Sequence, residues 1–295
     1  MAINNRLEPA TIARAAHVVT AMHKAGVKAP ADALLEEVIS ASLSAQHIRH
    51  SAMSSSSQSI EYRLDAINAG SDLSALVEGL LTCPSGRLCL YGPPGSGKSA
   101  FALHLAQQLG MPAHVQRASD ILSPYVGETE HNIASIFRRA TIDNAVLILD
   151  EADSFLFARE SAHRHWEVSA VNEFLTQMEA FEGLFVATTN LPRVLDAASM
   201  RRFDAKVEFH YLKSTQVAVL LRETCNLLKV EVDDCDHFSA GLRNLTPGDF
   251  ATVVRQARFS PVKGIGDLVD RLRGEVRQKL DSDMRSIGFM QNNAA

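Results

Sequence analysis

Short apolar runs alternate with helical patterns of apolar positions between residues 62 and 212. Five of these runs, at residues 87–91, 113–117, 145–149, 184–188 and 206–209, have the length and composition of strands. The runs at 146–149 and 184–187 are almost continuously apolar, which is typical of strands buried on both faces. The pattern therefore predicts an α/β domain with a parallel sheet over residues 62–212.

The regions on either side of this domain have only helical patterns. Residues 214–228, 249–258 and 267–280 predict a small all-α domain over 213–285, and we expect residues 286–295 to be a disordered tail. Near the start, a proline at the first turn predicts helices over residues 9–24 and 30–50. Residues 51–61 are serine-rich and lack a hydrophobic period, so we expect a linker between this helical N-terminal segment and the α/β domain.

Residues 4–13 resemble residues 242–251, because Leu-x-Pro leads into a helical pattern in both stretches. Residues 1–50 are then either the tail of an earlier helical module in a longer tandem protein, or one of two unrelated helical hairpins that begin alike. The sequence leaves both interpretations open.

Composition and charge narrow the class of protein. The formal net charge of −5 argues weakly against a nucleic-acid partner held by general electrostatics. No apolar stretch approaches the ~20 residues of a membrane-spanning helix, and a secretory signal pattern is lacking at the N-terminus. The four cysteines form neither a CxxC pair nor a Cys/His cluster, which predicts reduced thiols. We therefore expect a cytoplasmic protein.

A glycine-rich loop follows the first predicted strand and precedes the helical pattern at 100–109. The loop consists of Gly92, Pro93, Pro94, Gly95, Ser96, Gly97, Lys98 and Ser99. Between a strand and a helix, such a loop turns its backbone N–H groups toward phosphate oxygens, and the helix adds its positive N-terminal end. Lys98 can reach the β- and γ-phosphates, and the Ser99 hydroxyl can bind Mg²⁺. The loop predicts binding of a nucleoside triphosphate.

Two adjacent carboxylates, Asp150 and Glu151, end the predicted strand at 145–149. The C-terminal ends of parallel strands meet at the ligand crevice, so this pair is expected beside the phosphate loop. Asp150 is placed to hold Mg²⁺, usually through water, and Glu151 to polarise the water that attacks the γ-phosphate. The alternative is a solvated cap of the strand, which we disfavour because of the loop upstream.

Asn190 follows the next predicted strand and can hydrogen-bond the attacking water or the γ-phosphate. A turn-capping role is the alternative for this side chain.

Arg201 and Arg202 come after a short helical pattern and before the last predicted strand. From that place they reach the phosphates of a neighbouring subunit more easily than their own. An arginine supplied in trans can raise the rate by roughly 10³–10⁵. The alternatives are a solvent-facing basic pair, or Arg202 tied internally to a carboxylate.

Together, in this order and spacing, the phosphate loop, Leu-Asp-Glu-Ala-Asp, Ala-Thr-Thr-Asn and Leu-Asp-x-Ala-x-x-Arg-Arg-Phe-Asp resemble the AAA+ ATPases. More narrowly, residues 62–285 are similar to the AAA clade, which includes spastin, katanin and bacterial sporulation-type AAA ATPases. The resemblance implies a P-loop sheet of strand order 5-1-4-3-2 with a helical lid, ATP and Mg²⁺ as ligands, and a ring, most often a hexamer. Arg201 and Arg202 would then act on the next subunit. Residues 246–250 resemble the clade's lid turn, where other AAA+ proteins carry a sensing arginine, so Arg255 and Arg258 are not expected to be catalytic.

The segment 119–130 resembles the clade's first pore loop, with Tyr125, Val126 and Gly127 at its tip. In a ring, this tip would offer an apolar grip on an extended polypeptide. Pro124 stands where the clade usually has a basic residue, which leaves the loop's mobility and substrate preference open. A tyrosine packed into the domain is the alternative. Residues 159–166, with two histidines and the only tryptophan, are a second candidate channel loop, for which a solvated loop is favoured over a metal site.

The resemblance implies a Mg²⁺-dependent ATPase ring that remodels, unfolds or disassembles a protein substrate by threading it through a central pore. The alternative is a nucleic-acid-associated AAA+ ATPase of the loader or initiator type. The pore-loop residues and the acidic net charge favour the first function, so nucleic acid is not the expected partner.

Overall fold

The computed structural model describes residues 62–125, 127–156, 165–190, 197–231 and 235–287. All of them belong to one compact unit of the chain, Gln58–Ala295. The predictions for residues 1–61, for Val126, for 159–164 and for the last eight residues lie outside the described residues.

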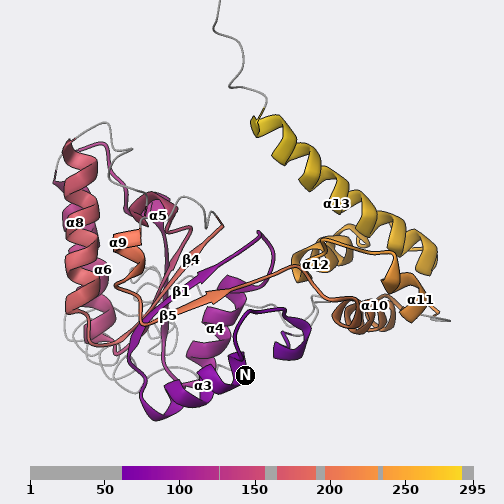
Figure 1. Cartoon of the computed structure of the whole chain (residues 1–295), viewed down its shortest axis with the longest axis horizontal. Coiled ribbons are helices and arrows are strands. Elements are labelled where there is room, and N and C mark those ends of the chain that lie inside the picture. Colours follow the sequence, from indigo (N-terminus) through magenta and orange to yellow (C-terminus); the bar gives the residue numbers. More distant parts are fainter. Residues whose placement is uncertain (1–61, 126, 157–164, 191–196, 232–234, 288–295) are drawn as a thin grey trace, which may run out of the picture. The chain divides into compact units, whose positions relative to one another are not determined.

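The described residues contain the predicted parallel sheet (Figure 1). Its strands are β1 (Gly86–Tyr91), β2 (Ala113–Arg117), β3 (Val146–Asp150), β4 (Leu184–Thr189) and β5 (Ala205–Glu208). Their order is β2-β3-β4-β1-β5, and every neighbouring pair is parallel. The predicted order is confirmed, and the strand ends lie within one residue of those expected from the apolar runs.

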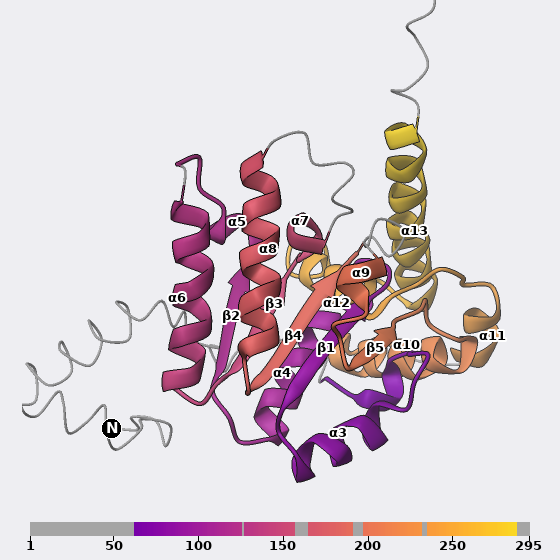
Figure 2. The same ribbon diagram turned by 60° about the vertical axis from the view of Figure 1, so that its left-hand side comes forward.

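Helices cover both faces of the sheet (Figure 2). On one face, Leu147 and Phe185 pack against α6 (Glu128–Ile142) and α8 (His165–Ala180). On the other, Ile148 and Val186 pack against α3 (Leu73–Thr82) and α4 (Lys98–Gln108). Successive side chains of a strand point to opposite faces, so every second residue belongs to the same layer. The same alternation decides on which face of the sheet the side chains just beyond the apolar runs of β3 and β4 lie.

Among the described residues, four short helical segments complete the α/β part. They are η1 (Leu64–Ala66), α5 (Ala118–Ile121), α7 (Asp153–Leu156) and α9 (Ala197–Met200).

The lid contains α10 (Ser214–Leu228), α11 (Cys235–Ala240), α12 (Pro247–Gln256) and α13 (Ile265–Ile287) around its own core of buried apolar side chains. Helix α10 has the predicted bounds. Helix α12 begins two residues before the expected start, because Thr246 caps it and Pro247 occupies its first position. Helix α13 continues seven residues beyond the expected end. The six-residue α11 was not predicted, because so short a helix has no measurable periodicity.

Within the described residues, the chain has no helix with the length and apolar character needed to span a membrane. All four cysteines are described, and none forms a disulfide.

Candidate nucleotide-binding site

The glycine-rich loop joins β1 to α4 as the sequence predicts, and two of its glycines are sterically required. Gly92 has a φ of 139°, and a Cβ there would lie 2.1 Å from the Phe209 carbonyl oxygen. Gly95 has a φ of 76°, and a Cβ there would lie 2.9 Å from Thr246 Oγ1 in the lid. A side chain at either position would be strained and would collide with a neighbouring segment. The loop thus forms a backbone cradle that passes Phe209 and Thr246 too closely for a side chain at either position.

Lys98 lies inside this cradle with only 6% of its surface exposed. Its Nζ donates hydrogen bonds of 2.9 Å to the carbonyl oxygens of Gly92 and Pro93. Burial lowers the pKa of Lys98 to about 8, although Asp150 and Asp153 oppose the shift. A buried ammonium group whose hydrogen bonds go to neutral carbonyls is well suited to bind an anion.

A second observation fits a bound phosphate. The Ser96 hydroxyl is buried in the same loop and has no hydrogen-bond partner in the structure. Because buried polar groups are normally hydrogen-bonded, such a group calls for a ligand or water. Together with Lys98 and the glycines, it indicates that the loop fits a triphosphate.

We expect Lys98→Met to stabilise the nucleotide-free protein by about 1 kcal/mol at pH 7. A pKa lowered from 10.5 to about 8 corresponds to a penalty of about 3 kcal/mol for keeping the group charged. Lys98→Met removes this penalty but also loses the two hydrogen bonds to carbonyls, which costs about 2 kcal/mol. The net stabilisation is therefore about 1 kcal/mol.

The pH dependence gives this prediction its signature. The pKa of Lys98 is lower in the folded chain than in the unfolded chain, so the unfolded chain binds more protons between pH 8 and 10.5. The stability of the native sequence therefore rises over that window relative to Lys98→Met, and the advantage of the variant shrinks. Urea unfolding of both proteins from pH 7 to 10 measures this difference in stability. A variant less stable than the native chain at pH 7 contradicts the prediction.

Ser99 and Asp150 meet at the start of α4, where Ser99 Oγ donates a 2.7 Å hydrogen bond to Asp150 Oδ1. Mg²⁺ prefers oxygen ligands and commonly uses one or two protein groups, with waters and phosphates completing its shell. These two side chains fit that role. The described residues contain no cluster of three or more His, Cys, Asp or Glu that would form an all-protein metal site.

A cavity of about 530 Å³ brings the three predicted motifs together. Its polar end is lined by Lys98, Ser99, Asp150, Glu151, Thr188 and Asn190. Glu151 is exposed and has a φ of 56°, so its backbone is left-handed where the chain leaves β3. The structure therefore places the predicted phosphate-binding, metal-binding and water-activating side chains around one space.

The other end of the cavity was not predicted from the sequence. It is largely apolar and lined by Tyr62, Arg63, Ala66, Ile67, Leu220, Pro247, Gly248 and Ala251. Such a surface suits the flat base of a nucleotide. These residues come from the segment before α3 and from two lid helices, and no local motif marks them.

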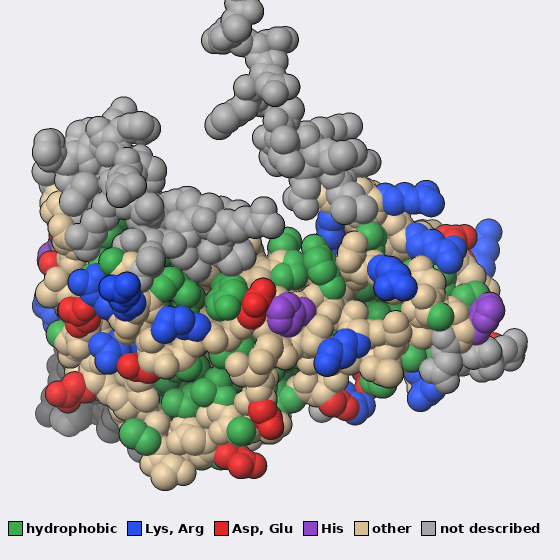
Figure 3. Space-filling view, in the orientation of Figure 1, with side chains coloured by type: hydrophobic (Ala, Val, Ile, Leu, Met, Phe, Trp, Pro, Cys, Tyr) green, Lys and Arg blue, Asp and Glu red, His purple; other side chains and the backbone are tan. Residues whose placement is uncertain are grey.

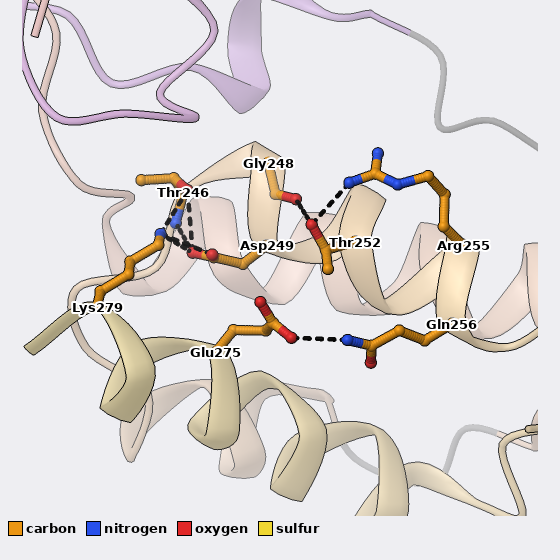
Figure 4. A network of polar contacts seen from close by, with 8 residues as sticks. All are labelled: Thr246, Gly248, Asp249, Thr252, Arg255, Gln256, Glu275 and Lys279. Carbon is orange, nitrogen blue, oxygen red and sulfur yellow. Dashed lines mark hydrogen bonds and ion pairs between the residues drawn. The ribbon is translucent and has the colours of Figure 1, made fainter. Parts of the chain in front are cut away.

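The lid is attached directly to the phosphate loop, because the Gly248 N–H donates a 2.9 Å hydrogen bond to the Gly95 carbonyl. Next to Gly248, the buried Asp249 carboxylate accepts bonds from the Thr246 N–H (2.8 Å) and from Lys279 Nζ (2.7 Å) on α13 (Figure 4). The position of the lid at the cavity is thus set jointly by the loop, α12 and α13.

The arginine at the exposed end of this network is engaged within its own helix. Arg255 Nη2 donates a 2.8 Å hydrogen bond to Thr252 Oγ1, and Thr252 Oγ1 donates one of 2.9 Å to the Gly248 carbonyl. Arg255 and Arg258 are both absent from the described lining of the cavity.

The two arginines after α9 differ in their surroundings. Arg202 Nε donates a hydrogen bond to Glu179 of α8, which is the internal carboxylate contact weighed as an alternative above. Arg201 is exposed. Neither side chain is among the described residues that line the cavity. The structure therefore does not bring this pair to the site of its own subunit.

Tyr125 lies on the loop between α5 and α6 with 74% of its surface exposed. The alternative of a tyrosine packed into the domain is therefore wrong. Gly127 caps α6 with a φ of 84°. Val126, the third residue of the predicted tip, lies outside the described residues.

Comparison with known proteins agrees with this geometry. Residues 88–211 match the family described as "ATPase family associated with various cellular activities (AAA)". The chain is 32% identical over 174 residues to the "uncharacterized AAA family ATPase y4kL" of Sinorhizobium fredii, covering 58% of this chain and 52% of that protein. It is 38% identical over 138 residues to the human "ATPase family gene 2 protein homolog A", covering 43% of this chain and 15% of that protein.

The chain thus spans about half the length of the first relative and a small part of the second. The name of the first relative agrees with the family match in naming an AAA family ATPase, and the name of the second gives an ATPase family. The phosphate loop, the acidic pair and Asn190 also surround one nucleotide-sized cavity, which agrees with the similarity of residues 88–211 to the AAA ATPase family.

Proposed function

We propose that this chain is a Mg²⁺-dependent ATPase that works as a ring of identical subunits, a hexamer, and threads a protein substrate through the ring to remodel or unfold it. One observation carries the proposal. The cavity has the groups needed to bind a triphosphate and activate water, whereas the exposed Arg201 lies outside the described lining of that cavity. A second subunit would supply the missing arginine.

Five polar residues of the cavity have a defined role in the proposed reaction. The Lys98 ammonium would neutralise charge on the β- and γ-phosphates, and Ser99 with Asp150 would hold Mg²⁺. When bound, the metal supplies further charge neutralisation at the phosphate oxygens. The Glu151 carboxylate would accept the proton of the attacking water, and the Asn190 amide would orient that water or the γ-phosphate.

The exposed Tyr125 supports a polypeptide as the substrate. An aromatic ring at a loop tip offers an apolar contact that does not depend on the substrate's sequence. The absence of disulfides among the four cysteines supports a cytosolic site of action.

One observation keeps the nucleic-acid alternative in view. On the face shown in Figure 3, Lys and Arg side chains gather over the lid, whereas the sheet domain carries both signs of charge. Such a group of basic side chains is the electrostatic feature that a phosphate backbone would need.

Stimulation of the ATPase by unfolded polypeptide or by DNA separates the two functions. We expect an unfolded protein, such as reduced carboxymethylated lactalbumin, to raise ATP turnover several-fold, and Tyr125→Ala to abolish that increase. Phe259→Ala is the matched control, because Phe259 on the lid is also a highly exposed aromatic ring, 90% exposed. Stimulation by DNA alone would refute the protein-remodelling proposal.

A further inference from the structure

Thr188 is the second-last residue of β4, is only 2% exposed, and is hydrogen-bonded to the last residue of β3 and to the two residues that follow it. Its hydroxyl donates a hydrogen bond to Asp150 Oδ1 and accepts one of 3.3 Å from the Glu151 N–H. Its carbonyl oxygen accepts a 2.9 Å bond from the Ala152 N–H. Only the two hydroxyl bonds depend on the side chain.

The register of the sheet explains why Thr188 makes these contacts. Leu149 of β3 pairs with Ala187 of β4, so Asp150 and Thr188 follow one position further along parallel strands. The Thr188 side chain is on the face of α4 and the phosphate loop, as its bond to Asp150 shows. The neighbouring Thr189 hydroxyl donates instead to Asp153, so it does not duplicate the contact.

This one hydroxyl is hydrogen-bonded to both Asp150 and Glu151, to the first through its carboxylate and to the second through its backbone N–H. Asp150 Oδ1 accepts from Ser99 on α4 and from Thr188 on β4, so its orientation is set from two sides. Glu151 has the left-handed φ of 56°, which a non-glycine residue keeps only where its surroundings hold it. A valine at position 188 would have the same shape but would leave the Glu151 N–H without this acceptor.

We propose that Thr188 is a positioning residue for ATP hydrolysis. Through one hydroxyl it holds the carboxylate assigned to Mg²⁺ and the backbone that carries the proposed base. The inference rests on the proposed roles of Asp150 and Glu151. Thr188 has no assigned ligand of its own, so its bonds can persist when nucleotide binds.

The test compares Thr188→Val, Thr188→Ser and Thr224→Val in the full chain. We expect Thr188→Val to lower kcat about tenfold with the KM for ATP changed less than about twofold, because misplaced catalytic groups affect the reaction more than binding. The Mg²⁺ concentration for half-maximal turnover should rise several-fold. Thr188→Ser should restore kcat to within about twofold of the native value. Thr224→Val is the matched control, since it removes a buried hydroxyl that has no hydrogen-bond partner.

Three results would overturn the inference. One is a Thr188→Val protein with native kcat and native Mg²⁺ dependence. Another is an equal loss in Thr188→Val and Thr188→Ser, because a side chain that keeps the hydroxyl would then fail to restore activity, and altered packing at this buried position would explain both losses. If the native chain hydrolyses no ATP, the proposed function fails. The role of Thr188 is then tested by measuring how the binding of a fluorescent ATP analogue depends on Mg²⁺. An unchanged dependence in Thr188→Val is then the third overturning result. Circular dichroism of each variant, with Thr188→Ala as a smaller replacement, excludes misfolding as the cause.

Discussion

Replacing Glu151 with glutamine should leave ATP bound and lower its hydrolysis by about a thousandfold, because the variant keeps the shape of the side chain and loses the base. Glu151 lines the polar end of the cavity, but it makes none of the contacts that hold Lys98 or Ser99. Binding and turnover should therefore separate in this variant. With ATP bound and hydrolysis blocked, the proposed ring should also persist in its assembled form.

Three measurements check this expectation. A fluorescent ATP analogue gives the affinity, single-turnover hydrolysis gives the rate, and light scattering with and without ATP gives particle size. Glu78→Gln provides the control, since Glu78 is an exposed carboxylate on α3, outside the described lining of the cavity. Turnover at the native rate in Glu151→Gln would remove this residue from its proposed role, and a fall in affinity equal to the fall in rate would point to a structural defect.

The sheet was predictable because its strands carry strong local signals. Residues of β3 and β4 are buried on both faces, so the sequence reads as apolar runs whose ends mark the strand ends. The strand order came from the family resemblance, not from the apolar pattern. The start of α12 had a usable signal in Thr-Pro-Gly-Asp, since threonine at the cap, proline after it and an acid three residues on are typical of a helix start.

The candidate site was predictable where a motif carries it and not elsewhere. Lys98, Asp150, Glu151 and Asn190 each lie at the end of a strand or the start of a helix, so the topology of the sheet alone brings them together. The apolar end of the cavity joins Tyr62 to Leu220 across more than 150 residues of sequence. That proximity depends on how the lid packs against the segment before α3, and no local pattern encodes it.

The role of Thr188 also could not be read from the sequence. In Ala-Thr-Thr-Asn, either threonine is a plausible β-strand residue, and which hydroxyl meets Asp150 depends on the pairing of β3 with β4. A shift of one residue in that pairing would exchange the two threonines between the faces of the sheet.

The arginine pair illustrates the same limit and leads to the prediction with the largest expected effect. Two adjacent arginines are equivalent in the sequence, but in the structure Arg202 donates to Glu179 and Arg201 is exposed. We therefore assign the proposed action on the neighbouring subunit chiefly to Arg201. Arg201→Ala should lower ATP turnover by at least about 10³-fold without loss of ATP binding. Arg202→Ala should have a smaller effect, because it removes a partly exposed ion pair with Glu179, a type of contact usually worth less than about 1 kcal/mol.

Mixing two inactive variants tests whether Arg201 acts in trans. Arg201→Ala keeps Glu151 in its own cavity, and Glu151→Gln keeps Arg201 for its neighbour. In a ring built from an equal mixture, about a quarter of the interfaces should combine the intact Glu151 of one subunit with the intact Arg201 of the next. Turnover should then return in the mixture, although each variant alone is inactive. A mixture of Arg201→Ala with Arg202→Ala does not test this, because Arg202→Ala keeps both Glu151 and Arg201 and should be active on its own. If no mixing ratio restores turnover, Arg201 acts within its own subunit, and if Arg201→Ala and Arg202→Ala lose equal activity, the contact with Glu179 does not distinguish them.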